Sequence, residues 1–223
     1  LIMKDNKVKL GGVSIGLAIN SVYYFKTFNP DGTINSYETT IDKDKMESEG
    51  KKIAQEVLSR LRNMEGLGDV PITIGLYAQE DKNSIVPGSY FAYAVSEKGN
   101  NLKWNDIDEE YVLFPSSKAT KSHADDATRF SLFQEDVNQY FPEHNGIVGK
   151  GFYVNGNLQS LSIDITMQFY GKAEVIGFSQ YLAGLLVEHY PKLSTEVKIE
   201  SVNGQEALIT FDPDMDEPFV HIY

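Results

Sequence analysis

The sequence predicts an α+β fold, in which helices pack on a mixed, largely antiparallel sheet. The main basis is a strand–helix–strand pattern that occurs twice, at about residues 13–77 and 158–211. The segment between these halves, residues 80–149, has the pattern of a hairpin followed by a short strand and a helix. Because no linker rich in Pro, Gly and Ser separates the halves, residues 1–223 are expected to form a single domain.

The first half begins with a run in which apolar residues alternate with small or polar ones, the period of a strand with one buried face. The run covers residues 13–25 and precedes Asn29-Pro30-Asp31-Gly32, a turn sequence that predicts a hairpin to residues 33–40. An apolar stripe at helical spacing predicts a helix over 45–63, and renewed alternation predicts a return strand over 70–77.

The second half repeats this order with a stronger alternation over residues 158–169. Residues 172–190 are apolar on nearly all sides, which predicts a buried helix that ends before Pro191. Asn203-Gly204 then predicts a tight hairpin between two further strands. The halves share a pattern but not residue identity, so duplication and the independent use of a common motif are both open.

The middle region contains one helix start and several short strands. Residues 89–96 and 101–104 predict a hairpin, and residues 111–114 a strand. Ser122-His123-Ala124-Asp125 fits a capping box, which predicts that a helix begins there.

Composition excludes several classes of function. The formal net charge is −12, with 20 Lys and Arg against 32 Asp and Glu, so binding to nucleic acid or to an anionic lipid surface through a basic patch is not expected. The absence of Cys excludes disulfides, thiolate nucleophiles and Cys-ligated zinc. No apolar run is long enough to span a bilayer, and the first residues lack the features of a signal peptide. A chain that starts at Leu1 is expected to be cut from a longer one.

Two motifs raise the possibility of hydrolysis. Gly12-Val13-Ser14-Ile15-Gly16 matches the G-x-S-x-G motif of serine hydrolases, although it falls inside an alternating strand where a nucleophile elbow requires a strand-to-helix turn. His123 with Asp125 and Asp126 could form a metal or acid–base cluster, but a helix cap explains the same aspartates. The acidic segment 212–217 lacks the glycine and glutamate spacing of a calcium loop; a solvated tail explains it, and a weak cation site formed by several of its carboxylates is the alternative. We therefore assign no catalytic residue, no metal ligand and no cofactor.

Aromatic residues on the expected strands suggest a binding groove. Alternation must expose some of them, and Tyr23, Tyr90 and Trp104 are the candidates to line a groove for a peptide or a sugar. The ordinary preference of aromatic residues for strands is the alternative explanation.

Four segments carry a resemblance to a known family: LAINSVYY at 17–24, VPITIGLY at 70–77, VPGSY at 86–90 and LFPS at 113–116. They resemble the CamS family, the sex-pheromone precursor lipoproteins of Gram-positive bacteria. The resemblance implies a full-length precursor whose signal peptide ends at a lipid-modified cysteine and releases a pheromone peptide for plasmid conjugation. This chain contains no cysteine, so it would be the extracytoplasmic domain without the anchor and the pheromone.

Three functions follow from these observations. The first is a non-enzymatic binding or interaction module for a peptide or a cell-wall glycan, held at the membrane only through an N-terminal lipid anchor that lies outside this chain. The second is a cell-envelope hydrolase that uses carboxylates or a metal. The third is a passive carrier domain. A groove lined by aromatic residues would favour the first, and His123 or a carboxylate pair in a cleft would favour the second.

Overall fold

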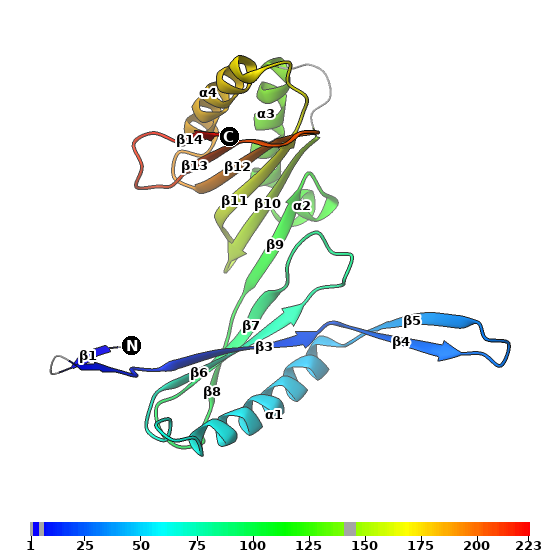
Figure 1. The fold of residues 1–223 in the computed structure, drawn as a ribbon, viewed down its shortest axis with the longest axis vertical. Coiled ribbons are helices and arrows are strands. Elements are labelled where there is room, and N and C mark those ends of the chain that lie inside the picture. The colour runs from blue at the N-terminus through cyan, green and yellow to red at the C-terminus, as the bar shows by residue number, and fades with distance from the viewer. Residues whose placement is uncertain (1, 5–6, 141–145) are drawn as a thin grey trace. The chain divides into compact units, whose positions relative to one another are not determined.

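A computed structural model of the protein describes residues 2–4, 7–140 and 146–223. The chain divides into two compact units, Leu1–Glu109 and Glu110–Tyr223 (Figure 1). Helices and mixed, largely antiparallel sheets are present in both, which confirms the α+β class. The expectation that residues 1–223 form a single domain stays a prediction.

The described residues of the first unit form one helix, a four-stranded sheet and two ribbons. Its elements are β1 (Ile2–Lys4), β2 (Lys7–Lys9), β3 (Val13–Asn20), β4 (Val22–Phe28), β5 (Ile34–Thr40), α1 (Lys43–Arg62), β6 (Ile72–Gln79), β7 (Ser89–Ser96) and β8 (Lys103–Asp106). The sheet has the order β3-β6-β7-β8, while β1 pairs with β2 and β4 pairs with β5 as separate ribbons.

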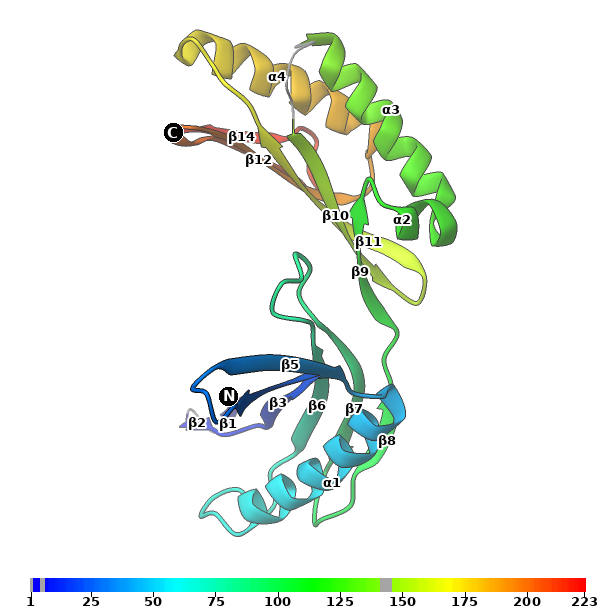
Figure 2. The ribbon, with the colours of Figure 1, turned by 90° about the vertical axis from the view of Figure 1, so that its right-hand side faces the viewer.

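Helix α1 covers one face of this sheet (Figure 2). It connects β3 to β6, which run parallel in an unbroken register from Val13↔Ile72 to Asn20↔Gln79. The core between helix and sheet consists of Ala54, Leu58, Ile72, Ile74, Leu76 and Ala92. Gly50 is required for this close packing, because a Cβ there would lie 2.3 Å from Cδ1 of Ile19.

The Arg62 side chain holds the C-terminal end of α1 to the α1–β6 loop and to the β7–β8 connection. Its guanidinium donates hydrogen bonds to the carbonyl oxygens of Leu67 (2.8 Å) and Val70 (2.5 Å), which lie before β6. It also donates to the carbonyl and hydroxyl oxygens of buried Ser96 (2.8 and 2.9 Å) and to the carbonyl oxygen of Gly99 (2.9 Å). One side chain thereby pairs carbonyl groups at the helix exit, before β6 and in the β7–β8 turn.

The second unit is a six-stranded sheet with three helices. Its elements are β9 (Glu109–Phe114, whose first residue belongs to the first unit), α2 (Ser117–Ser122), α3 (Ala124–Tyr140), β10 (Gly146–Val154), β11 (Asn157–Thr166), α4 (Lys172–His189), β12 (Ser194–Ser201), β13 (Gly204–Phe211) and β14 (Phe219–Ile222). The strand order is β14-β13-β12-β11-β10-β9. The helices α3 and α4 lie together on one face, where Phe130, Phe133, Phe178 and Leu182 are buried against Ile163 and Ile165 of the sheet (Figure 2).

Both units contain the same five-element motif. In the first unit the motif is β3-α1-β6-β7-β8, and in the second it is β11-α4-β12-β13-β14. In each, the helix joins two parallel strands, and two further strands follow in antiparallel order on the same side. This confirms the two strand–helix–strand halves expected from the sequence.

Two local expectations are corrected. Residues 13–25 form two strands, because β3 ends at Asn20 and the chain changes partner at Ser21, from β6 to β5. The helix expected at Ser122-His123-Ala124-Asp125 forms as α3, which begins at Ala124, but Ser122 is the last residue of α2, whose N-cap is Ser116. The short α2 was missed because a six-residue helix carries too little periodicity to distinguish it from a loop. Among the described residues, no helix has both the length and the hydropathy needed to cross a membrane.

We expect Arg62→Lys to destabilise the first unit by about 3 kcal/mol, because an ammonium cannot replace the fork of donors and leaves buried carbonyl groups unpaired. Urea unfolding followed by the fluorescence of Trp104, the single Trp of the chain, reports on this unit alone. Arg60→Lys is the matched control, since Arg60 is largely exposed and makes only a 3.7 Å ion pair with Glu56. An equal effect of the two substitutions would contradict the role given to Arg62.

Candidate functional site

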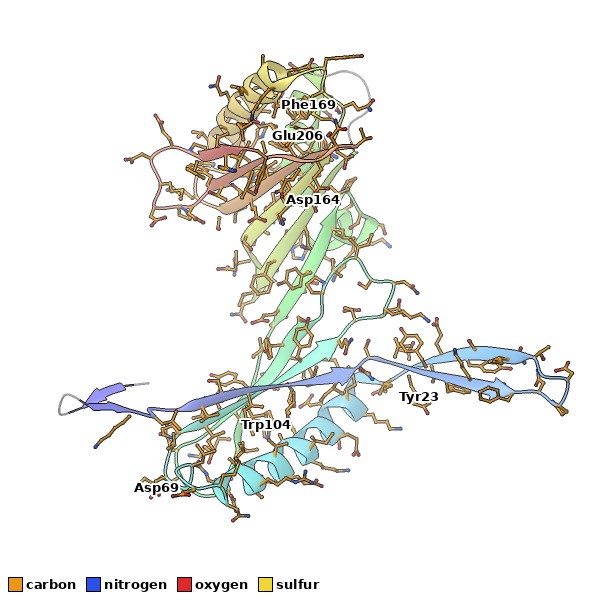
Figure 3. All side chains as sticks on the ribbon, in the orientation of Figure 1. Tyr23, Asp69, Trp104, Asp164, Phe169 and Glu206 are labelled. Carbon is orange, nitrogen blue, oxygen red and sulfur yellow. The ribbon has the colours of Figure 1, made fainter. Side chains whose placement is uncertain are left out.

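The β4–β5 ribbon carries three exposed aromatic side chains that stack on one another: Tyr23, Phe25 and Tyr37, here called the aromatic row. The ring centroids are 5.7 Å apart between Tyr23 and Phe25, and 5.3 Å between Phe25 and Tyr37, with interplanar angles of 21° and 20°. Their exposed fractions are 59%, 37% and 47%. The ribbon extends beyond the end of β3, and Figure 3 labels Tyr23 on it.

The register of the ribbon places these rings on one face. Phe25 pairs with Tyr37 across the two strands, and Tyr23 lies two residues before Phe25. The register follows from the turn between the strands, where Gly32 has φ +84° and the Thr33 N–H donates to Asp31 Oδ1 (2.9 Å). Every residue of β5 is exposed, so the stacked rings bury no core of their own.

Tyr24, on the other face of the ribbon, anchors it to the loop after β6. Its hydroxyl donates to Asp81 Oδ2 (2.5 Å) and accepts from the Lys82 N–H (3.1 Å). The Lys82 ammonium lies 4.4 Å from the Tyr24 ring centroid, a cation–π contact. The hydrogen bond from Tyr24, helped by the Asn83 N–H, lowers the pKa of Asp81, and the same bond raises the pKa of Tyr24. The ribbon is therefore tied to the sheet near its base.

A depression of about 400 Å³ lies against this anchor. Its lining residues are Tyr24, Phe25, Lys26, Ser36, Tyr37, Glu38 and Lys82. The volume is at the lower end of the range for small-molecule sites. Two ammonium groups and one carboxylate beside aromatic rings suit a ligand that combines an apolar ring or side chain with polar groups.

The three residues proposed from the sequence lie on different surfaces of the first unit. Tyr23 belongs to the aromatic row. Trp104 of β8 lies on the face covered by α1, with the Lys51 ammonium 5.6 Å from its ring (Figure 3). Tyr90 of β7 lies on the opposite face, where a Cβ on Gly16 or Gly75 would lie within 2.9 Å of its side chain. The structure does not bring the three together, and contact of any of them with a ligand stays a prediction.

Sequence reasoning missed Tyr37 and the anchor. Tyr37 could have been found from the turn at residues 29–32. This turn places Asn29 opposite Thr33, so the register of the hairpin places Phe25 opposite Tyr37. The contact between Tyr24 and Asp81 joins residues 57 apart, and no local pattern predicts it.

His123 takes part in a polar network inside the second unit. Its Nε2 shares a hydrogen bond with Glu110 Oε1 (2.8 Å), and its ring stacks on Tyr153 at 3.8 Å between centroids. The Tyr153 hydroxyl donates to Asp126 Oδ2 (2.9 Å), and burial together with this carboxylate raises the pKa of Tyr153. Burial alone would raise the pKa of Glu110, but hydrogen bonds from Lys118 and His123 outweigh it and lower that pKa.

This network does not match the cluster that the sequence suggested. His123 pairs with Glu110 and not with Asp125 or Asp126, and its side chain is only 9% exposed. His189 similarly shares a hydrogen bond with Asp136 (2.8 Å), a partner that its sequence neighbourhood did not reveal. Within residues 2–4, 7–140 and 146–223, no group of three or more His, Asp or Glu side chains could hold a metal ion. His144 lies outside the described residues.

Ser14 of the G-x-S-x-G motif is exposed and is the second residue of β3. The chain at this point is extended and pairs with β6 in regular register, whereas a nucleophile elbow requires a turn from strand to helix. The motif is therefore part of the sheet.

A family model described as "CamS sex pheromone cAM373 precursor" matches residues 2–217. The solved C-terminal domain of the sex pheromone staph-cAM373 precursor from Staphylococcus aureus is 35% identical, with a TM-score of 0.82, over 93% of this chain and 63% of that chain. A sex pheromone precursor from Lactobacillus salivarius subsp. salivarius UCC118 is 30% identical, with a TM-score of 0.82, over 93% of this chain and 61% of that chain.

A further structure, described as sex pheromone staph-cAM373 precursor, is 22% identical with a TM-score of 0.55, over 91% of this chain and 75% of that chain, and shows a likeness of fold alone. No match was found among curated proteins. This chain thus spans less than two thirds of the length of the two more similar structures, at 63% and 61%.

The anchor predicts a pH-dependent attachment of the ribbon. Because the pKa of Asp81 is lowered, its carboxylate is fully available to the Tyr24 hydroxyl at pH values above about 3.9, the ordinary pKa of Asp. The attachment is lost as the pH falls through the lowered pKa. We expect Tyr24→Phe to move the carboxyl titration of Asp81, followed by NMR, upward toward the ordinary value. Asp31, whose pKa is lowered mainly by hydrogen bonds from Thr33, is the internal control and should not move. An unchanged Asp81 midpoint would show that Tyr24 does not hold this carboxylate in solution.

Proposed function

Because the chain belongs to the family of CamS sex pheromone cAM373 precursors, we propose that it is the extracellular globular domain of such a precursor and acts as a non-enzymatic binding module. In this proposal the precursor is a lipoprotein of a Gram-positive bacterium, and its signal-peptide region supplies a pheromone for conjugation. The chain contains no Cys, so a lipid-modified cysteine would lie outside residues 1–223. The globular domain would then act at the outer surface of the membrane.

The aromatic row is the observation that carries the proposal. Three stacked rings, exposed on the ribbon, give a flat apolar surface at a small cost in side-chain entropy. Such a surface suits the apolar faces of sugar rings or the side chains of a peptide. The ligand class is therefore a peptide or a cell-wall glycan.

The hydrolase alternative lacks a comparable observation. It requires His123 or a carboxylate pair that can reach a substrate from an open cleft. The His123 ring is instead stacked on Tyr153 and hydrogen-bonded to Glu110. A group held in this way stabilises the second unit, and we propose no reaction for it.

Binding can be tested with isolated Gram-positive cell wall, digested and separated into glycan and stem-peptide fractions, and with a panel of short peptides. We expect one of these probes to raise the unfolding temperature, since a ligand that binds only the folded state stabilises it. The double substitution Tyr23→Ala with Tyr37→Ala should weaken binding at least about tenfold.

The matched control is Thr27→Ala with Asn35→Ala, a cross-strand pair on the same face of the ribbon and beyond the aromatic row. This double variant should bind as the unchanged chain does. Binding that survives loss of the aromatic row would remove the ribbon from the proposal, and no shift with any probe would favour a passive carrier.

A further inference from the structure

Strand β3 lies at the edge of its sheet with one side unpaired among the described residues. The Val13 N–H donates to the Pro71 carbonyl oxygen (2.9 Å) and the Ser21 N–H to that of Gln79 (3.1 Å). Successive residues of a strand direct their N–H and C=O groups to opposite sides, so the odd-numbered residues pair with β6. The backbone groups of Ser14, Gly16, Ala18 and Asn20 therefore point to the open side.

The same open side continues along β4. The Ile41 N–H donates to the Ser21 carbonyl oxygen (2.8 Å). Strand β5 therefore lies on the same side of the chain as β6. At the turn of the hairpin the Asn29 N–H donates to the Thr33 carbonyl oxygen (2.9 Å). With this register, the odd-numbered residues of β4 form their backbone hydrogen bonds with β5. The even-numbered residues of β4 then face outward as those of β3 do. We call residues 14–25 the open edge.

The open edge lacks the features by which proteins usually prevent an added strand from pairing. Residues 13–25 contain no charged residue and no Pro, in a chain whose net charge is −12. The pairing of β3 with β6 shows no bulge along its length. A long, regular and uncharged edge is a template for another strand.

In the second unit the corresponding strand edge is paired with a further strand. There the motif begins with β11, the counterpart of β3, and β10 covers the other side of β11. The two strands pair antiparallel from Gly146↔Thr166 to Val154↔Asn157. The first unit has no such strand among its described residues, so the same motif is covered in one unit and open in the other.

Apolar side chains flank the open edge on the α1 side. Lys51, Gln55 and Arg62 form the flank of α1 that contacts the β7–β8 turn and β8. At 3.6 residues per turn, Ile53 and Val57 lie on the opposite flank, which the strand order places over β3. Ile53 is 49% exposed, and Leu17 and Ile19 beneath this flank are only half-buried. An added strand would cover them.

We propose that the open edge binds an extended segment of a partner polypeptide as an additional antiparallel strand. The segment would place alternate apolar side chains against Ile53 and toward the aromatic row, and its backbone would pair with the even-numbered residues of β3. This names a polypeptide as the ligand of the binding module and so rests on the proposed function. A second copy of the chain is disfavoured as the occupant, because two molecules of net charge −12 repel each other.

The test uses a phage-displayed library of random dodecapeptides, panned against the chain, with affinities of the selected peptides measured by calorimetry. Ala18→Pro removes an outward N–H and leaves the pairing with β6 intact, so it should weaken binding at least about tenfold. Ala18→Thr keeps the N–H at the same exposed position and should bind nearly as the unchanged chain does. Ile53→Glu, on the exposed flank of α1, should also weaken binding and does not disturb the sheet.

Hydrogen exchange gives a readout that a general loss of structure would not mimic. In the complex the amides of Gly16 and Ala18 should exchange more slowly, while those of Ile15 and Leu17, already bonded to β6, should change little. This alternation, together with the effect of Ala18→Pro, would support the proposal. Exchange that slows equally at all four amides would contradict it.

Three results would overturn the proposal. One is that Ala18→Pro weakens the binding of none of the selected peptides. Another is binding that depends on Tyr23 and Tyr37 but not on Ala18, which would leave the binding module standing and place the peptide elsewhere. The third is a dimer, seen by sedimentation of the chain alone and abolished by Ala18→Pro, which would make a second copy the occupant.

Discussion

The parallel pairing of β3 with β6 is the constraint on which the first unit depends. It requires a crossover, and α1 supplies it, so the helix must lie on one face and bury Ala54 and Leu58 against Ile72 and Ile74. The pairing also decides which backbone groups of β3 are used, and it leaves the even-numbered ones at the edge. The Arg62 side chain then holds the helix exit to the loops around this pairing. The core, the open edge and the direction of the ribbon all follow from the pairing of β3 with β6.

The two units show how one motif leads to different surfaces. Both have a strand, a crossover helix and three further strands in the same order, yet among the described residues only β11 has a neighbour on its outer side. That neighbour, β10, completes a buried core in which Gly149 and Gly151 approach aromatic rings. The first unit has instead a ribbon inserted between β3 and α1, with its aromatic row exposed. Polar groups of the second unit, such as His123 with Glu110, serve its packing.

Much of the fold could be predicted from local patterns, whereas the candidate site could be predicted only in part. The Asn29-Pro30-Asp31-Gly32 turn, the stripe of α1 and the alternation of β11 each involve neighbours within a few residues, and all three formed as expected. The helix expected at residues 122–125 also formed, from Ala124, but Ser122 belongs to the short helix that Ser116 caps, which periodicity does not reveal. Tyr23 was found as an exposed ring, while its partner Tyr37 depended on the register of the hairpin.

The sequence by itself determined the class of fold, the two halves and the family resemblance, because these depend on spacing along the chain. Only the tertiary structure decided which face and which edge of each strand is covered. Alternation separates the two faces of a strand but does not say which one a helix will cover, so Trp104 and Tyr90 lie on opposite faces of one sheet. Nor does a strand's own sequence say what lies beside it. The edge of β11 is paired because the strand just before it in the chain, β10, folds back on it, whereas among the described residues no strand pairs with the outer side of β3.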